Sequence, residues 1–188
     1  MNFYTYNNGY KKFADKLITS LKKFNLSYYI YEIHDLNDKW VEVKIHKGFP
    51  ILEVMKKFPN RNIVWVDADS IIEKDPVLFN EIDADLSVSY VPHMNQTNTA
   101  VIFIRNNEYM IKFINEWYNK SKEHVKLGRK GLGGQDVLQD MLRNNDLNIK
   151  DHYKPLDPAY CIIFDNDNYN GIEGIITQWQ ASRGHTNK

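Results

Sequence analysis

The sequence contains a single cysteine, Cys161, among its 188 residues. One cysteine cannot form a disulfide within the chain, and it excludes a zinc site made of several thiolates. This scarcity is typical of a reducing compartment, so we expect a cytoplasmic protein, either bacterial or viral and acting in the host cytoplasm. Because Cys161 stands in the apolar run 160–164, we interpret it as a buried structural thiol rather than a nucleophile.

Long apolar runs and an excess of either charge are also missing. No apolar run approaches the length of about 18 residues that a membrane span needs. The first residues read as a strand and not as a signal peptide. The 24 basic residues balance the 24 acidic residues, which argues against a nucleic-acid partner. No repeat or linker interrupts the chain, so we expect one domain over residues 1–188.

The apolar residues that are present recur with the periods of strands and helices. They predict strands at 2–6, 27–33, 63–66, 86–91 and 100–105, and helices at 10–24, 49–58, 108–121 and 134–144. Residues 7–9 read as a turn and 124–133 as a loop, whereas the chain after residue 151 has strand and loop character. This alternation predicts an α/β domain with a mostly parallel central sheet flanked by helices.

Two acidic residues, Asp67 and Asp69, directly follow the apolar strand 63–66. Ligands of an open α/β sheet bind beyond the carboxyl ends of its strands. If the chain stays extended there, the two carboxylates point to the same side and repel each other unless a cation lies between them. Mg²⁺ or Mn²⁺ suits such oxygen ligands and can neutralise a diphosphate. A plain acidic turn would give the same pattern, but the buried strand before it favours the metal.

At this point the sequence resembles the GT-A glycosyltransferases, in particular the small nucleotide-diphospho-sugar transferases and GT8-like enzymes. Residues 64–70, VWVDADS, are similar to the family's apolar strand followed by a D-x-D motif. Further similar segments are 3–21, 46–52, 98–106, 133–136 and 178–185. Gly48 stands where the family often has proline, and Ala100 replaces the usual glycine. The resemblance implies the GT-A fold, with a Rossmann-like and mostly parallel sheet.

The resemblance also implies an activity: transfer of a sugar from a nucleoside-diphosphate sugar, expected to be a UDP-sugar, to a hydroxyl of a carbohydrate or other acceptor. Asp67 and Asp69 would hold Mn²⁺ or Mg²⁺, with His185 as the third protein ligand. Nucleotide contacts would come from Thr5, Tyr6 and Lys47. Arg183 carries a charge that could offset that of the diphosphate.

The remaining resemblance concerns the reacting sugar, with Asn98 facing it and Gln135 and Asp136 near its anomeric carbon or the acceptor. Gly133 and Gly134 before a predicted helix would leave N–H groups free for close approach. An acidic residue in a first helical turn is also favoured by the helix dipole alone, so an ordinary helix start fits the same pattern. Our hypothesis is that Asp136 acts as the base or stabilises the oxocarbenium-like centre.

Three other functions are compatible with parts of the pattern. A non-catalytic nucleotide-sugar or carbohydrate-binding module would keep the fold without turnover. A sugar nucleotidyltransferase would need a glycine-rich loop near the N-terminus, which residues 7–10 do not match. A metal-dependent phosphohydrolase or nuclease could use the acidic residues, although the neutral charge argues against a nucleic-acid substrate. Trp40 and Trp179 are the candidates for stacking on a sugar.

Overall fold

The computed structural model describes residues 2–33, 47–91, 95–128, 133–164, 169 and 171–179. Its main sheet has six strands in the order β2-β1-β3-β6-β5-β7. They are β1 (Asn2–Tyr6), β2 (Tyr29–Ile33), β3 (Ile63–Asp67), β5 (Leu86–Val91), β6 (Gln96–Ile104) and β7 (Tyr153–Leu156). β6 pairs antiparallel with both β3 and β5, whereas the other pairs are parallel. The α/β fold with a mostly parallel sheet is therefore confirmed.

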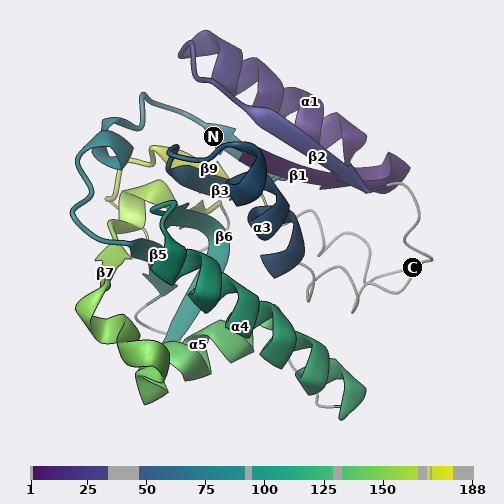
Figure 1. Ribbon diagram of the computed structural model, residues 1–188. Helices are drawn as coiled ribbons and strands as arrows, with labels where there is room; N and C mark the ends of the chain where they lie inside the picture. The colour runs from purple at the N-terminus through teal and green to yellow at the C-terminus, as the bar shows by residue number, and fades with distance from the viewer. Residues whose placement is uncertain are drawn as a thin grey trace.

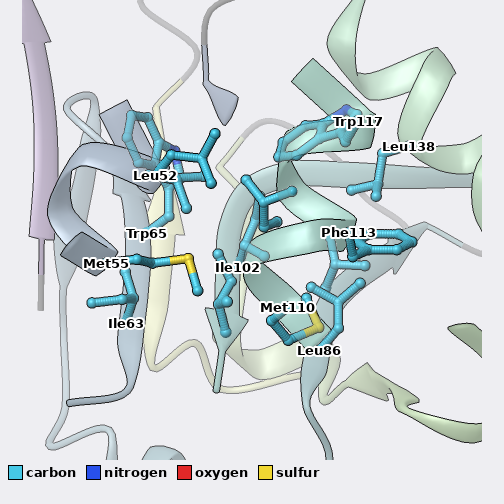
Figure 2. Close-up of a cluster of buried hydrophobic side chains, with 14 of the residues drawn as sticks. Leu52, Met55, Ile63, Trp65, Leu86, Ile102, Met110, Phe113, Trp117 and Leu138 are labelled. Carbon is cyan, nitrogen blue, oxygen red and sulfur yellow. The ribbon is translucent and has the colours of Figure 1, made fainter. Parts of the chain in front are cut away.

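Both faces of this sheet are covered (Figure 1). The helices are α1 (Asn7–Lys23), α3 (Gly48–Lys57), α4 (Glu108–Lys126) and α5 (Gly134–Asn144). Ile63 and Trp65 of β3 pack with residues of α3, α4 and α5 in one buried cluster, which Figure 2 shows. Val64 and Val66 belong to a second cluster with Leu17 of α1. Successive strand residues point to opposite faces, which explains the uninterrupted apolar run of β3.

A smaller sheet lies on the α1 side and has the order β4-β9-β8. Its strands are β4 (Ser70–Ile72), β8 (Ile162–Ile163) and β9 (Ile176–Gln178). The Ser20 hydroxyl of α1 accepts a hydrogen bond of 3.0 Å from the backbone N–H of Ile72, which ties this sheet to the helix. Short 3₁₀ helices complete the described elements: η1 (Val77–Asn80), η3 (Asp146–Asp151) and η4 (Pro158–Tyr160).

Several predicted elements have the same first and last residues in the structure, namely strands 2–6 and 86–91 and helix 134–144. Others need correction. Residues 7–9 are not a turn but the start of α1, and α4 continues to Lys126 where a loop was expected. β4 was not predicted. The polar residues 96–99 extend β6, since they pair with β5 beyond an irregularity at Val88 and Ser89.

The expected polar loop at 35–39 and the segment 40–45, which includes Trp40, lie outside the described residues. In the part of the chain that is described, no helix combines the length and apolar character required to cross a bilayer.

Gly48 determines how closely α3 approaches α4. A Cβ atom at this position would lie 2.8 Å from the Cβ of Tyr118 and 3.2 Å from its Cα. Because the nearer atoms belong to the backbone and to the root of a side chain, no rotamer change relieves the contact. The absence of a side chain at Gly48 therefore lets the start of α3 rest directly on α4.

We predict that Gly48→Ala destabilises the fold by about 1–3 kcal/mol through this overpacking. Lys56→Ala is a control in the same helix, because Lys56 is exposed and its partner among the described residues is Glu53, one turn earlier in α3. Urea unfolding followed by circular dichroism measures both changes. Equal midpoints for the Gly48→Ala variant and the wild type would show that α3 can move away from α4.

Candidate functional site

The carboxyl ends of β1 and β3 lie next to each other. In the ladder between these strands, Tyr4 is the partner of Asp67. Thr5 and Tyr6 therefore end β1 just beyond the level of Asp67, at the same edge of the sheet. The structure describes only the backbone of these two residues, so their predicted contact with a nucleotide stays a prediction.

The antiparallel strand β6 brings its first residues to this same edge. Val101 pairs with Val66 of β3, and Asn98 pairs with Ser89 near the end of β5. Continuing this register sets Ala100 opposite Asp67, so Thr99 and Asn98 lie one and two residues beyond the level of Asp67. Because β6 runs against its neighbours, its amino end meets their carboxyl ends. The predicted sugar-facing residue Asn98 and the predicted metal ligand Asp67 therefore share one edge.

The Asp67 carboxylate is engaged by two donors. The indole Nε1 of Trp65 donates to Oδ1 over 2.7 Å. The Lys47 ammonium donates to Oδ2 over 2.8 Å and also lies 2.7 Å from Oδ1. Only 16% of the Lys47 side chain and 23% of the Asp67 side chain are exposed, so this ion pair is largely shielded from water. The sequence predicted Lys47 as a nucleotide contact and contained no sign that Asp67 is its partner.

Lys47 connects Asp67 to β6 and to α5. Its ammonium also donates to the carbonyl oxygen of Thr99 over 2.9 Å and lies 3.3 Å from the Thr99 hydroxyl. The backbone N–H of Thr99 donates in turn to Oε1 of Gln135 over 3.4 Å. Lys47 just before α3, Asp67 of β3, Thr99 of β6 and Gln135 of α5 thus form one hydrogen-bonded chain. Thr99 is the member that sequence reasoning missed, and only its position beside Asn98 could have suggested it.

The start of α5 is held in place from inside the protein. Gly133 has φ 62°, a left-handed conformation that glycine adopts readily. The carbonyl of Gly134 accepts a hydrogen bond of 2.6 Å from Nε1 of the buried Trp117. Farther along α5, Oε1 of Gln139 accepts from the backbone N–H of Thr97 over 2.9 Å. Gln135 and Gln139, one turn apart on α5, therefore face the amino end of β6, and Asp136 follows Gln135 in the first turn.

The chain turns at Ala68 and Asp69 before β4 begins at Ser70. The expectation that the chain stays extended from Asp67 to Asp69 is therefore wrong, because residues 68 and 69 form a turn between β3 and β4. Asp69 is only 7% exposed, and its carbonyl accepts from the backbone N–H of Trp179 over 2.8 Å. The acidic turn thus lies against the end of β9.

Asn98 is held on the same side by β9. Its amide nitrogen donates to Oε1 of Gln178 over 3.2 Å, and its amide oxygen accepts from the backbone N–H of Ala100 over 2.9 Å. Trp179 follows Gln178; the residue is 42% exposed, and its ring stacks on Phe164 with centroids 4.9 Å apart. Part of an aromatic residue is therefore exposed to solvent next to the acidic turn.

The donor chemistry at the turn fits a hard divalent cation, because Asp67 and Asp69 supply carboxylate oxygens at one strand end. Within the described residues, no group of three or more histidine, cysteine or acidic side chains could hold a metal. His185 and Arg183 lie outside those residues, so their predicted roles stay predictions. The negative charge of Asp67 is balanced by Lys47, so a cation that binds to Asp67 is repelled by the positive charge of this lysine.

Cys161 lies behind this site and is fully buried. Burial raises the pKa of its thiol to about 12, and the charges of Asp67, Lys47 and Asp69 have smaller effects. A thiol held neutral in this way cannot serve as a nucleophile at neutral pH. The interpretation of Cys161 as buried and structural is confirmed.

Comparison with known proteins places this geometry in a known fold. No model of a protein family matches the chain, and no curated protein sequence matches it. Among solved structures, a glycosyltransferase involved in the glycosylation of the major capsid of PBCV-1 is similar with a TM-score of 0.72. The two chains are 12% identical, and the match covers 98% of this chain and 96% of the other.

The glycosyltransferase GlyE of Streptococcus pneumoniae TIGR4 is also similar, with a TM-score of 0.67 at 16% identity over 95% of this chain. Its apo form matches with a TM-score of 0.68 at 15% identity. This chain spans about half the length of GlyE, since 54% and 53% of the two GlyE chains are covered. The protein has the GT-A fold that the sequence resemblance implied.

We predict that iodoacetamide labels Cys161 in the native protein at about pH 8 at least roughly 100-fold more slowly than in the unfolded chain, because a raised pKa leaves almost no thiolate. Mass spectrometry of samples quenched over time, with and without guanidinium chloride, gives the two rates. Similar rates in both samples would contradict the burial of the thiol.

Proposed function

We propose that this protein is a metal-dependent glycosyltransferase that moves a sugar from a nucleoside-diphosphate sugar, most simply a UDP-sugar, to a hydroxyl acceptor. The observation that supports this most is the hydrogen-bonded chain from Asp67 through Lys47 and Thr99 to Gln135. It joins the acidic strand end to the start of α5 in a fold shared with solved glycosyltransferases. Ligands of such sheets bind at this edge.

In this proposal Asp67 and Asp69 hold Mn²⁺ or Mg²⁺, with His185 completing the protein ligands. The cation supplies positive charge that stabilises the departing nucleoside diphosphate. Thr5 and Tyr6 at the end of β1 contact the nucleotide, and Lys47 and Arg183 pair with phosphate oxygens. The low exposure of Asp69 and Lys47 supports strong electrostatic interactions there, because a shielded site has a lower effective dielectric than water.

The residues on β6 and α5 would act on the sugar. Asn98 is only 8% exposed and is oriented by Gln178 and Ala100, as expected for an amide that positions a hydroxyl. Gln135 and Asp136 stand in the first turn of α5, where the helix dipole favours negative charge. We propose that Asp136 accepts the acceptor proton or stabilises the oxocarbenium-like centre.

The acceptor side is proposed to include Trp179. Its exposed ring is anchored through its backbone to Asp69 and through its side chain to Phe164. A flat aromatic face of this kind suits the apolar face of a sugar ring. A carbohydrate acceptor is therefore the most natural partner for this surface.

Thermal-shift measurements with nucleoside diphosphates and nucleotide sugars, with and without Mn²⁺, test the donor site. We expect a matching donor to raise the melting temperature of the wild type only when Mn²⁺ is present, because a ligand bound to the folded state alone stabilises it. Asp69→Asn should remove this shift, whereas the control Asp75→Asn, at an exposed position, should keep it. A donor-induced shift that survives in Asp69→Asn would remove Asp69 from the metal site.

The catalytic assignment is tested by Asp136→Ala. We expect the rate of nucleotide-sugar hydrolysis or transfer to fall by about 10²–10⁴-fold, while donor binding persists, because an acid–base group acts on the chemical step. Asp140→Asn is the matched control, since Asp140 is exposed one turn farther along α5. Nucleotide release over time gives both rates. Donor binding without turnover in the wild type would instead favour the non-catalytic module.

A further inference from the structure

The ion pair between Lys47 and Asp67 affects how a metal cation and a diphosphate would bind to the proposed site. The ammonium group of Lys47 contacts both carboxylate oxygens of Asp67 and donates a hydrogen bond to the carbonyl oxygen of Thr99. The contact is short, and both side chains are largely shielded from water. In the absence of ligands, a positive charge supplied by the protein therefore already stands at a carboxylate proposed to bind a metal cation.

The side chain of Lys47 has more freedom to move than the backbone beside it. The next residue, Gly48, is packed so closely that even a Cβ there would lie 2.8 Å from the Cβ of Tyr118. The backbone at the start of α3 is thus fixed against α4. The lysine side chain carries a flexible four-carbon stem, which allows its ammonium to change partners while its Cα stays in place.

We infer that Lys47 is the counter-ion of Asp67 in the absence of ligands, and that its ammonium group pairs with a phosphate group instead when a diphosphate binds. As a consequence, the metal and the diphosphate bind cooperatively. A divalent cation alone meets a like charge beside Asp67, which weakens its binding. A diphosphate offers Lys47 new oxygen partners and frees the carboxylate. Because such coupling is reciprocal, each ligand strengthens the binding of the other.

This inference rests on the proposed function and goes beyond it, since a lysine that merely contacts the nucleotide would have no effect on binding of the metal alone. The decisive variant is Lys47→Gln, which removes the charge and keeps a hydrogen-bond donor near Asp67. Lys47→Arg keeps the charge. Lys56→Gln removes one lysine charge from the same helix at an exposed position away from Asp67, and is the matched control.

In the experiment, each protein is titrated with MnCl₂ alone, and binding is measured by calorimetry and by the paramagnetic resonance signal of free Mn²⁺. We expect Lys47→Gln to bind Mn²⁺ about tenfold or more tighter than the wild type, because an adjacent like charge is removed. Lys47→Arg and Lys56→Gln should bind it as the wild type does. Should Lys47→Gln not unfold cooperatively, Lys47→Met replaces it under the same criterion.

The second arm repeats the titrations with MnCl₂ premixed with inorganic diphosphate. The gain in affinity over Mn²⁺ alone should be large in the wild type and several-fold smaller in Lys47→Gln. Detectable binding with no tighter Mn²⁺ affinity in Lys47→Gln, or an equal diphosphate gain in both proteins, overturns the inference and leaves the proposed metal site in place. Absence of Mn²⁺ binding in every protein, with and without diphosphate, overturns both.

Discussion

The ion pair between Lys47 and Asp67 is the contact on which the organisation of the candidate site depends. It joins the start of α3 to the end of β3, and through Thr99 it reaches β6 and α5. The lysine stands where α3 packs against α4 without an intervening side chain, so its position is set by helix packing. The carboxylate stands at the end of a strand buried on both faces. A polar contact at the sheet edge is thus positioned by two apolar layers.

The antiparallel direction of β6 is the second feature that brings residues of the candidate site together. Its polar residues 96–99 would be poorly placed in the middle of a sheet, where apolar side chains cover both faces. At the edge they meet Gln135 and Gln139 of α5 on one side and Gln178 of β9 on the other. These amide side chains satisfy backbone donors and an amide group that would otherwise be left without partners. The same contacts bring Asn98 of β6 and Gln135 of α5 to the same end of the sheet.

Much of this could be read from local pattern. The apolar run before Asp67 predicted a strand buried on both faces, and the spacing of apolar residues in α5 predicted that helix to the residue. The position of Asp67 at a strand end followed directly. The turn at Ala68 and Asp69 was not predicted, since it leads into β4, whose strand partner β9 lies about a hundred residues farther along the chain. The polar start of β6 was missed for a similar reason, since its strand state comes from pairing with β5 and not from apolar alternation.

By itself, the sequence determined the order and type of the long helices and of most strands of the main sheet, and the placement of an acidic motif behind a buried strand. The physical reason is that hydrophobic periodicity records which face of each element is buried, and that record is local. Only the tertiary structure decided which polar groups meet. Lys47 and Asp67 are 20 residues apart, Lys47 and Thr99 are 52 apart, and Asn98 and Gln178 are 80 apart. Contacts over such separations depend on strand order and helix packing, and no single stretch of the chain encodes either one.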